Sequence, residues 1–324
     1  MRNLTNCSAA ASDTILRSQS APACPAKNTR AGISRKQQFF HKGPGLQEIA
    51  RFYDLKTRSI LYRYGPGPRV HYHAGLMTDC APASATASDL HERLVAAQER
   101  SLEYAARVWN APLTLSGDVL DIGCGLGGGS IFWAQNFGAR VMAVTCVPSH
   151  IDWVGRFAAQ AGVESQVIPV LHDAAELPGE NQFDAAVAVD STGYLPRKRW
   201  FRRLASLLRP KGHVFIMDCF LGRPEYAEPY NRHWLTSIGT IDEYLEAARD
   251  ASLSLRLCED ISPLTEYFWA TTVALMRLET EGAPSQAVIS RRQASIRMHE
   301  LVHQGLSDGG YHYAIMAFSR TGVI

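Results

Sequence analysis

The 324-residue sequence has no apolar run near the roughly 18 residues that a membrane-spanning helix needs. It also lacks an excess of one charge, because 33 basic residues face 31 acidic ones and the net charge is +2. A chain so balanced has no overall field that would attract it to nucleic acid or to a membrane surface. Its seven cysteines are scattered, odd in number and without a C-x-x-C pair. This pattern argues against a zinc site and a disulfide framework, and it favours reduced thiols in a cytoplasmic protein.

The N-terminal segment differs in composition from the rest of the chain. Residues 1–36 are rich in Ser, Ala, Thr and Asn, and Asp13 is their one acid. We expect a disordered leader here, with an organelle transit peptide as the alternative. In the whole chain hydrophobic residues make up 46% and charged residues 20%, which is typical of a globular protein with a large core.

From residue 117 onward, strand-like apolar runs alternate with helical patterns. Strands are predicted at 118–122, 140–145, 167–171, 184–190, 213–218 and 311–318. Helices are predicted at 129–137, 149–161, 198–208, 240–251 and 287–304. This alternation is typical of an α/β protein with a doubly wound, Rossmann-like sheet.

The rest of the chain is expected to cover this sheet. Residues 37–115 are predicted to form a helical cap or lid, in which Ser88 caps a helix over 89–109 and 64–75 form a loop. Residues 116–324 would form the sheet domain. Two aromatic-rich insertions, at 219–240 and 259–286, would act as a cap over its ligand site.

The most informative segment is Val119–Ser130, where an apolar strand enters a glycine-rich turn before a helix. Glycines permit positive φ and leave no Cβ to block a ligand on the loop. The following helix offers its free N–H groups to that ligand. Gly123, Gly125 and Gly128 also satisfy G-x-G-x-x-G, the dinucleotide fingerprint.

The residues around this turn favour a different ligand. Asp121 precedes the first glycine by two residues and suits a cationic group better than a pyrophosphate. The second strand ends in Thr145, where a dinucleotide-binding protein would have an acid. D-x-G-x-G therefore resembles motif I of the class I S-adenosylmethionine-dependent methyltransferases.

Four polar residues follow predicted strands and should meet at one edge of the sheet. Asp121 would bind the ammonium of the donor, Thr145 and His150 its ribose, and Asp173 its adenine amino group. Asp173 has the alternative role of a helix N-cap. The complete set of expected cofactor-binding residues is Asp121, Gly123, Gly125, Gly127, Thr145, Cys146, His150, Asp173 and Ala174.

Asp190 ends the fourth predicted strand and would face the transferable methyl group. It could act as a general base or stabilise positive charge, or only bond to the next loop. A second polar cluster, His71-Tyr72-His73, lies in a glycine-proline loop. Without a third ligand it is a weak metal pattern. Contact with an anionic substrate, helped by Arg63 and Arg69, fits it better.

Taken together, the chain resembles the geranyl diphosphate C-methyltransferases, within the wider group of sterol, tocopherol and cyclopropane-type methyltransferases. The resemblance runs in order from about residue 47 to the end. It rests on Glu48–Tyr53, Val70–Gly75, Val144–Thr145, Asp190–Thr192, Trp269 and Ser307–Tyr313. The chain departs from the family where Asp190 replaces a catalytic glutamate and His150 replaces a glutamine.

The resemblance implies methylation of an alkene carbon of a prenyl diphosphate through a tertiary cation, with cyclisation as a further outcome. It implies that Asp190 is the base or cation stabiliser, with His71 and His73 as further catalytic residues. Mg²⁺, arginines or histidines would balance the diphosphate. The residues expected around the acceptor are Phe52, Tyr53, Tyr72, Tyr194, Tyr267 and Trp269.

Two other functions remain open on sequence alone. One is C-, O- or N-methylation of another small apolar natural-product intermediate. The other is binding of S-adenosylmethionine without catalysis. Nucleic-acid methylation is disfavoured, because no N/D-P-P-Y motif follows the fourth strand and the basic residues form no stripe. A homo-oligomer is neither indicated nor excluded.

Overall fold

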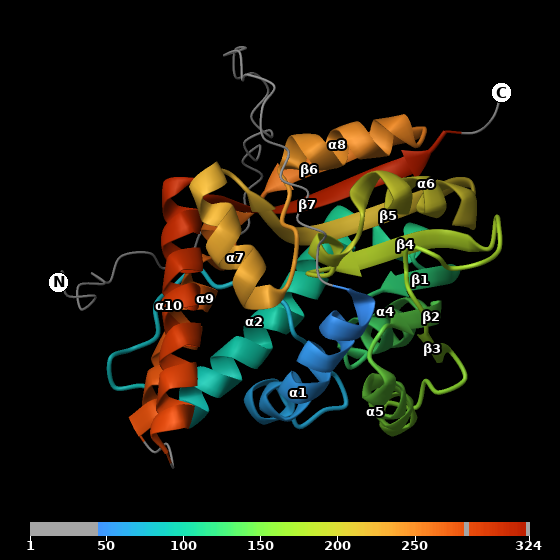
Figure 1. Ribbon diagram of the computed structural model, residues 1–324. Coiled ribbons are helices and arrows are strands. Elements are labelled where there is room, and N and C mark those ends of the chain that lie inside the picture. Colours follow the sequence, from blue (N-terminus) through green and yellow to red (C-terminus); the bar gives the residue numbers. More distant parts are fainter. Residues whose placement is uncertain (1–44, 282–284, 322–324) are drawn as a thin grey trace, which may run out of the picture.

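The computed structural model describes residues 45–281 and 285–321, so the predicted leader over 1–36 lies outside the described residues. A seven-stranded sheet forms the centre, in the order β3-β2-β1-β4-β5-β7-β6 (Figure 1). The strands are β1 (Asp118–Ile122), β2 (Arg140–Thr145), β3 (Val167–Leu171), β4 (Phe183–Val189), β5 (Leu208–Leu221), β6 (Leu253–Asp260) and β7 (Tyr311–Arg320). β1 to β5 pair in parallel, and β7 is antiparallel to both β5 and β6.

Helices cover both faces of this sheet, which confirms the doubly wound α/β prediction. The α-helices are α1 (Leu46–Tyr64), α2 (Ala87–Val108), α3 (Ala111–Thr114), α4 (Gly128–Phe137), α5 (Pro148–Gln160), α6 (Arg197–Leu207), α7 (Ala227–Trp234), α8 (Ile241–Asp250), α9 (Ser262–Glu281) and α10 (Gln286–Asp308). Two short 3-10 turns, Thr192–Tyr194 and Pro224–Tyr226, complete the elements named. In Figure 1, α7, α9 and α10 lie together at one end of the sheet, and α5 lies at the opposite end beside β3.

The period-2 alternation of strand residues divides the core into two layers. In β1, Val119 packs in the layer that contains Trp109 and Trp133, whereas Leu120 packs in the layer that contains Trp200 of α6 and Tyr244 of α8. All six side chains are at most 2% exposed. A sheet buried on both faces needs such continuous apolar strands, which explains why the sequence pattern located them so well.

Several details differ from the sequence-based expectations. β5 is much longer than the strand predicted at 213–218, and α7 and α9 lie in segments for which no helix was predicted. Helix α2 is capped by Thr86 rather than Ser88, because Thr86 and Asp89 form a reciprocal capping box. β6 was not predicted, although its leucines alternate along the chain. Cys80 and Cys258 are disulfide-bonded, so the expectation of reduced thiols is wrong for these two, whereas Cys124, Cys146 and Cys219 are free.

The described part of the chain contains no helix with both the length and the apolar character that a membrane span requires.

Candidate active site

A cavity of about 320 Å³, here called the loop cavity, lies at the carboxyl ends of β1, β2 and β4. This is where the strand order reverses. Eight of the nine expected cofactor-binding residues line it: Asp121, Gly123, Gly125, Thr145, Cys146, His150, Asp173 and Ala174. The ninth, Gly127, is the N-cap of α4 and faces Val154, whose Cγ1 would lie 3.1 Å from an added Cβ. The fold thus gathers into one wall residues that are dispersed along the sequence.

The glycines of the turn serve different purposes. A Cβ at Gly123 would lie 2.6 Å from the Cβ of Ser191, and one at Gly128 would lie 2.5 Å from the carbonyl oxygen of Val70. These two positions therefore need glycine for packing. Gly125 also has a positive φ, of 55°, but an added Cβ would meet nothing within 4 Å. Gly125 thus leaves open space in the cavity wall, as a ligand lying on the loop would require.

Asp121 places a buried carboxyl in the wall of the loop cavity. Asp121 is only 5% exposed, and its Oδ2 accepts a hydrogen bond from Oγ of Ser130 at 2.5 Å. Burial raises the pKa of Asp121 to about 6, and the Ser130 hydroxyl opposes that shift only in part. A cationic group in the cavity would stabilise the carboxylate, so the site fits an ammonium.

The other polar residues of the loop cavity already have partners in the protein. Thr145 accepts a hydrogen bond from the backbone N–H of Val147 at 3.1 Å. Nε2 of His150 lies 3.0 Å from the Thr57 hydroxyl, and burial lowers the pKa of His150 to about 4, so this imidazole is neutral. Asp173 accepts from the N–H of Ala175 at 2.9 Å, and a turn rather than a helix follows it, so Asp173 is not the helix N-cap considered as its alternative role. Its carboxyl nevertheless lines the cavity.

A smaller cavity of about 70 Å³, here called the aromatic cavity, adjoins the first. Five residues line both: Tyr53, Tyr72, His73, Asp190 and Tyr194. The remaining aromatic wall of the smaller cavity consists of Tyr64, Tyr230, Trp234, Phe268 and Trp269. Four of the six expected acceptor residues therefore line one or both cavities, whereas Phe52 and Tyr267 line neither of the two.

Asp190 lies at the boundary between the two cavities. It follows β4 directly, in a left-handed conformation with φ of 46°. Its Oδ2 accepts a hydrogen bond from the backbone N–H of Ala74 at 2.8 Å. A non-glycine residue in this region of φ and ψ is uncommon and persists where the surroundings hold it. Here the backbone N–H of Asp190 donates to the Met217 carbonyl oxygen of β5, and the Ala74 N–H in the loop after α1 holds the carboxyl group.

A second carboxyl, that of Asp218 in β5, lies beside Asp190 and was not predicted. Its Oδ2 accepts from the Thr192 N–H at 2.8 Å and from the Thr192 hydroxyl at 2.6 Å. Burial and the Asp218 charge raise the pKa of Asp190 well above its usual range. Burial also raises the pKa of Asp218, but hydrogen bonds from Thr192 and from the N–H of Cys219 oppose the shift. Asp218 therefore keeps the charge, and Asp190 holds the proton of the pair.

The sequence contained one signal for Asp218. It is the last residue of a predicted strand, at the same edge of the sheet as Asp121 and Asp190. The pairing itself needed the structure, because β4 and β5 had to be neighbours in register.

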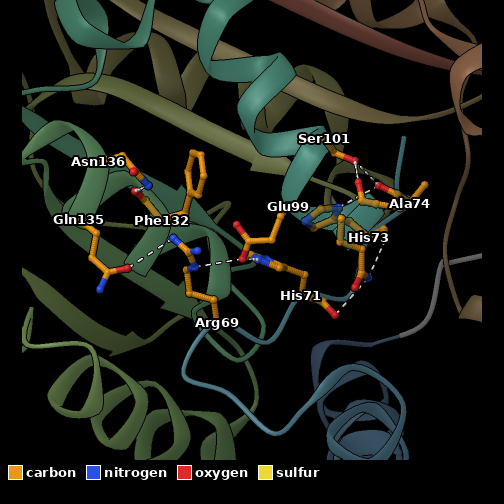
Figure 2. A network of polar contacts seen from close by, with 11 residues as sticks. Arg69, His71, His73, Ala74, Glu99, Ser101, Phe132, Gln135 and Asn136 are labelled. Atoms are coloured by element: carbon orange, nitrogen blue, oxygen red, sulfur yellow. Dashed lines mark hydrogen bonds and ion pairs between the residues drawn. The ribbon is translucent and has the colours of Figure 1, made fainter. Parts of the chain in front are cut away.

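The two histidines of the loop after α1 are held differently (Figure 2). Nε2 of His71 lies 2.9 Å from Oε1 of Glu99, and the same oxygen lies 3.0 Å from Nε of Arg69. His73 instead directs Nδ1 to the carbonyl oxygen of Ala74 at 2.9 Å. Burial and His71 lower the pKa of His73 to about 3, so its ring is neutral. Since Nδ1 donates, Nε2 of His73 carries a lone pair, and this buried atom has no hydrogen-bond partner among the described residues.

Over residues 45–281 and 285–321, no group of three or more His, Cys, Asp or Glu side chains is arranged to hold a metal ion. The His71 and His73 pair is consistent with this, because Glu99 and the Ala74 carbonyl already engage one nitrogen of each ring.

Known proteins resemble this chain in both sequence and fold. Residues 119–212 match the family model described as a methyltransferase domain. The chain is 25% identical over 291 residues to geranyl diphosphate 2-C-methyltransferase of Streptomyces lasalocidi, covering 86% of this chain and 91% of that protein. It is 30% identical over 178 residues to 27-O-demethylrifamycin SV methyltransferase of Amycolatopsis mediterranei, covering 52% and 64% respectively.

The fold has a solved counterpart. Geranyl diphosphate C-methyltransferase from Streptomyces coelicolor A3(2), in complex with Mg²⁺, geranyl-S-thiolodiphosphate and S-adenosyl-L-homocysteine, superposes with a TM-score of 0.73. The match covers 85% of this chain and 98% of that one, at 20% identity. The resemblance inferred from the sequence motifs is thus confirmed.

Proposed function

We propose that this chain, an S-adenosylmethionine-dependent methyltransferase, methylates an alkene carbon of a prenyl diphosphate. One observation carries the proposal: a buried carboxyl pair, Asp190 and Asp218, lies where the loop cavity meets a cavity walled by aromatic rings. An apolar cavity with a single negative site suits a substrate that becomes cationic only during the reaction.

The loop cavity fits the methyl donor. Its open space over Gly125 can accept a flat ligand, and Asp121 offers a carboxyl to the donor ammonium. Thr145 and His150 would lie along its ribose, and Asp173 near its adenine. When bound, the donor supplies an electrophilic methyl group on a positively charged sulfur. The protein's own part is to hold that group at the boundary between the cavities.

The residues at the boundary would stabilise and then discharge the cation. Formation of the new carbon–carbon bond consumes the alkene electron pair and leaves a tertiary cation on the acceptor. The rings of Tyr53, Tyr72 and Tyr194 face that region, and the carboxyl pair contributes one negative charge. Loss of a proton from the adjacent carbon restores an alkene. Either the pair or the lone pair on Nε2 of His73 accepts that proton.

We also infer that the cation forms in a closed chamber. The hydroxyls of Tyr53 on α1 and Tyr194 after β4 hydrogen-bond to each other across the boundary between the cavities. We assign residues 37–115 to a helical lid and residues 116–324 to the methyltransferase domain, with cap segments at about 219–240 and 259–286. Exclusion of water by such a lid would protect the cation from capture as an alcohol. Cyclisation would follow if the cation folds back before it loses the proton.

A substrate screen tests this function. The full chain, with Mg²⁺ present, is incubated with methyl-labelled S-adenosylmethionine and with C5, C10 and C15 prenyl diphosphates. We expect label in the hydrocarbon of at least one of them. If none is methylated while the protein binds the donor, the prenyl function is wrong.

One relative supports a second candidate, methylation of an oxygen on another apolar metabolite. The match to 27-O-demethylrifamycin SV methyltransferase is the observation in its favour. In that case Nε2 of His73 would accept the hydroxyl proton. Hydroxylated apolar acceptors in the same screen separate the two candidates, and binding of the donor without turnover of any acceptor would indicate a non-catalytic binding protein.

A further inference from the structure

Four basic side chains gather beside the aromatic cavity, and we call them the basic cluster. They are Lys56 and Arg63 on α1, His233 on α7 and His299 on α10. The ring centroids of His233 and His299 are 6.1 Å apart. The other three members each act electrostatically on His299. In Figure 1, α7 lies against α10, and α1 approaches from below.

The basic cluster has too little negative charge to balance it. Nη2 of Arg63 forms an ion pair with Oε2 of Glu279 at 2.6 Å. No other carboxylate among the described residues forms an ion pair with any of the four. The Lys56 ammonium lies over the ring of Phe52, 4.1 Å from its centroid. Burial lowers the pKa of His233 to about 4 and that of His299 to about 3, so both rings are neutral near pH 7. The single acid therefore faces two cations, Lys56 and Arg63.

Several nitrogens here are also buried without a hydrogen-bond partner among the described residues. They are Nε of Arg63, Nε2 of His233 and Nε1 of Trp269. Burial and neighbouring positive charge lower the pKa of Lys56 to about 8. Burial and Lys56 lower the pKa of His233 to about 4. Buried donors with no acceptor destabilise a fold, so their concentration at one place calls for a ligand rich in acceptors.

The aromatic cavity links this cluster to the reaction centre. His299, which is 7% exposed, lines that cavity together with Trp269, and Asp190 lines the same cavity. Of the four members only His299 lines the cavity, and the other three are its electrostatic neighbours. An acceptor with an anionic end and an apolar chain would thus meet His299 at one part of the wall and the carboxyl pair at another. The aromatic rings would lie along the chain between the two.

We propose that the basic cluster binds the diphosphate group of the acceptor. This assignment rests on the proposed function. It differs from the expectation that the His71 and His73 loop contacts the anion. In that loop Glu99 pairs with both Arg69 and His71, although Nδ1 of His71 and Nε2 of His73 are also buried without a partner among the described residues. In the basic cluster no carboxylate of the described residues pairs with the Lys56 ammonium. A diphosphate offers many acceptor oxygens to such donors.

Inorganic pyrophosphate tests the site without catalysis. Its binding to the full chain is measured by calorimetry with Mg²⁺ present, for the parent and for Lys56→Gln and His233→Gln. Matched controls are Arg58→Gln, exposed on α1, and Arg232→Gln, exposed on α7 beside His233. We expect each cluster variant to bind pyrophosphate about tenfold more weakly or worse, and each control to bind as the parent does.

Turnover provides the second readout. The cluster variants should raise KM for the prenyl diphosphate at least as much as they weaken pyrophosphate binding, while S-adenosylhomocysteine affinity stays at the parent value. That affinity also reports that the variants are folded. A merely structural role would weaken both ligands together and would overturn the proposal.

The outcomes separate this inference from the function on which it rests. If prenyl diphosphates are methylated but the cluster variants bind pyrophosphate as the parent does, the basic cluster is not the anion site. If the parent binds no pyrophosphate, the inference also fails. If pyrophosphate binds through the cluster but no prenyl diphosphate is methylated, the anion site stands and the proposed acceptor is wrong.

Discussion

The loop cavity and the aromatic cavity share five residues but are built in different ways. The loop cavity comes mainly from short turns that follow consecutive strands, so each of its residues lies next to a local motif. The aromatic cavity comes from α1, α7, α9 and α10, which are far apart in the chain. The first construction is fixed by the topology of a parallel sheet, whereas the second depends on how helices pack over that sheet. The residues that bind the donor can therefore stay the same while the residues around the acceptor change.

A substitution at Asp190 should have the largest effect, because it should abolish most turnover without changing donor affinity. Asp190→Asn replaces the protonated member of the carboxyl pair with an amide of the same shape, so the two groups no longer share a proton. We expect turnover to fall by about 10²- to 10⁴-fold, because the amide cannot pass a proton from the acceptor to the charged Asp218. Affinity for S-adenosylhomocysteine, measured by calorimetry, should stay at the parent value, since Asp121 and the glycine loop are untouched.

Asp152→Asn, on the exposed side of α5, is the matched control for a carboxyl-to-amide change. It should leave turnover unchanged. Full activity in Asp190→Asn would remove the Asp190 carboxyl from the mechanism and leave the charged Asp218 and Nε2 of His73 as the remaining bases.

Asp121 tests the donor side through both affinity and pH. Asp121→Asn should weaken S-adenosylhomocysteine binding about 10- to 150-fold, because a charged hydrogen bond to the ammonium is lost. Since burial raises the pKa of Asp121 to about 6, donor affinity of the parent should increase between about pH 5 and pH 7. The variant should lose that dependence, and a parental pH profile in the variant would contradict the assignment.

Asp121 should also make the stability of the protein depend on pH, but in the opposite direction: donor affinity increases as the pH rises, whereas stability decreases. An acid whose pKa in the folded protein lies above its ordinary value of 3.8 contributes stability that is complete below that pH. This contribution is lost as the pH rises through about 6. At pH 8 the parent has lost this contribution, whereas Asp121→Asn has no carboxyl group to ionise. The free energy of unfolding of the variant should therefore be about 2–3 kcal/mol higher than that of the parent. Urea unfolding at pH 5 and pH 8 measures this, and an equal difference at both values would rule it out.

Gly125 and Gly138 offer a matched pair of left-handed glycines. Their φ angles are 55° and 71°, and an added Cβ at either position would meet no protein atom within 4 Å. Alanine at either should cost about 1–2 kcal/mol of stability, because only the backbone is strained. Only Gly125→Ala puts a methyl group into the loop cavity, so it alone should weaken S-adenosylhomocysteine binding, by about tenfold. Equal affinities in the two variants would show that the donor does not lie against Gly125.

Most residues that the sequence singled out line one of the two cavities: eight of the nine expected for the donor and four of the six expected for the acceptor. Asp121, Thr145 and Asp173 follow strands whose apolar runs are unambiguous, and parallel strands bring their carboxyl ends to one edge. The Asp190–Asp218 pair needed β4 and β5 in register, and only Asp218's place at a strand end hinted at it. The basic cluster joins three helices that only packing brings together, so no spacing in the chain announces it. Gly127 fits the motif but serves the start of α4, which pattern alone does not reveal.

The smallest expected effect on ligand binding concerns the hydrogen bond that joins the two sides of the site. The Thr57 hydroxyl on α1 donates to the Tyr53 carbonyl oxygen at 2.9 Å and lies 3.0 Å from Nε2 of His150 on α5. Thr57→Val keeps the branched shape but leaves a buried imidazole N–H without an acceptor, which should cost about 1–3 kcal/mol of stability. Thr57→Ser keeps the hydroxyl and should lose much less. Urea unfolding of both variants measures the contribution of the hydrogen bond to stability.

Because α1 carries Tyr53 into the boundary between the cavities, KM for the acceptor should rise a few-fold in Thr57→Val, while donor affinity changes less. Equal changes for donor and acceptor would mean that α1 belongs to both sides of the site and that the division between the two cavities is not a functional one.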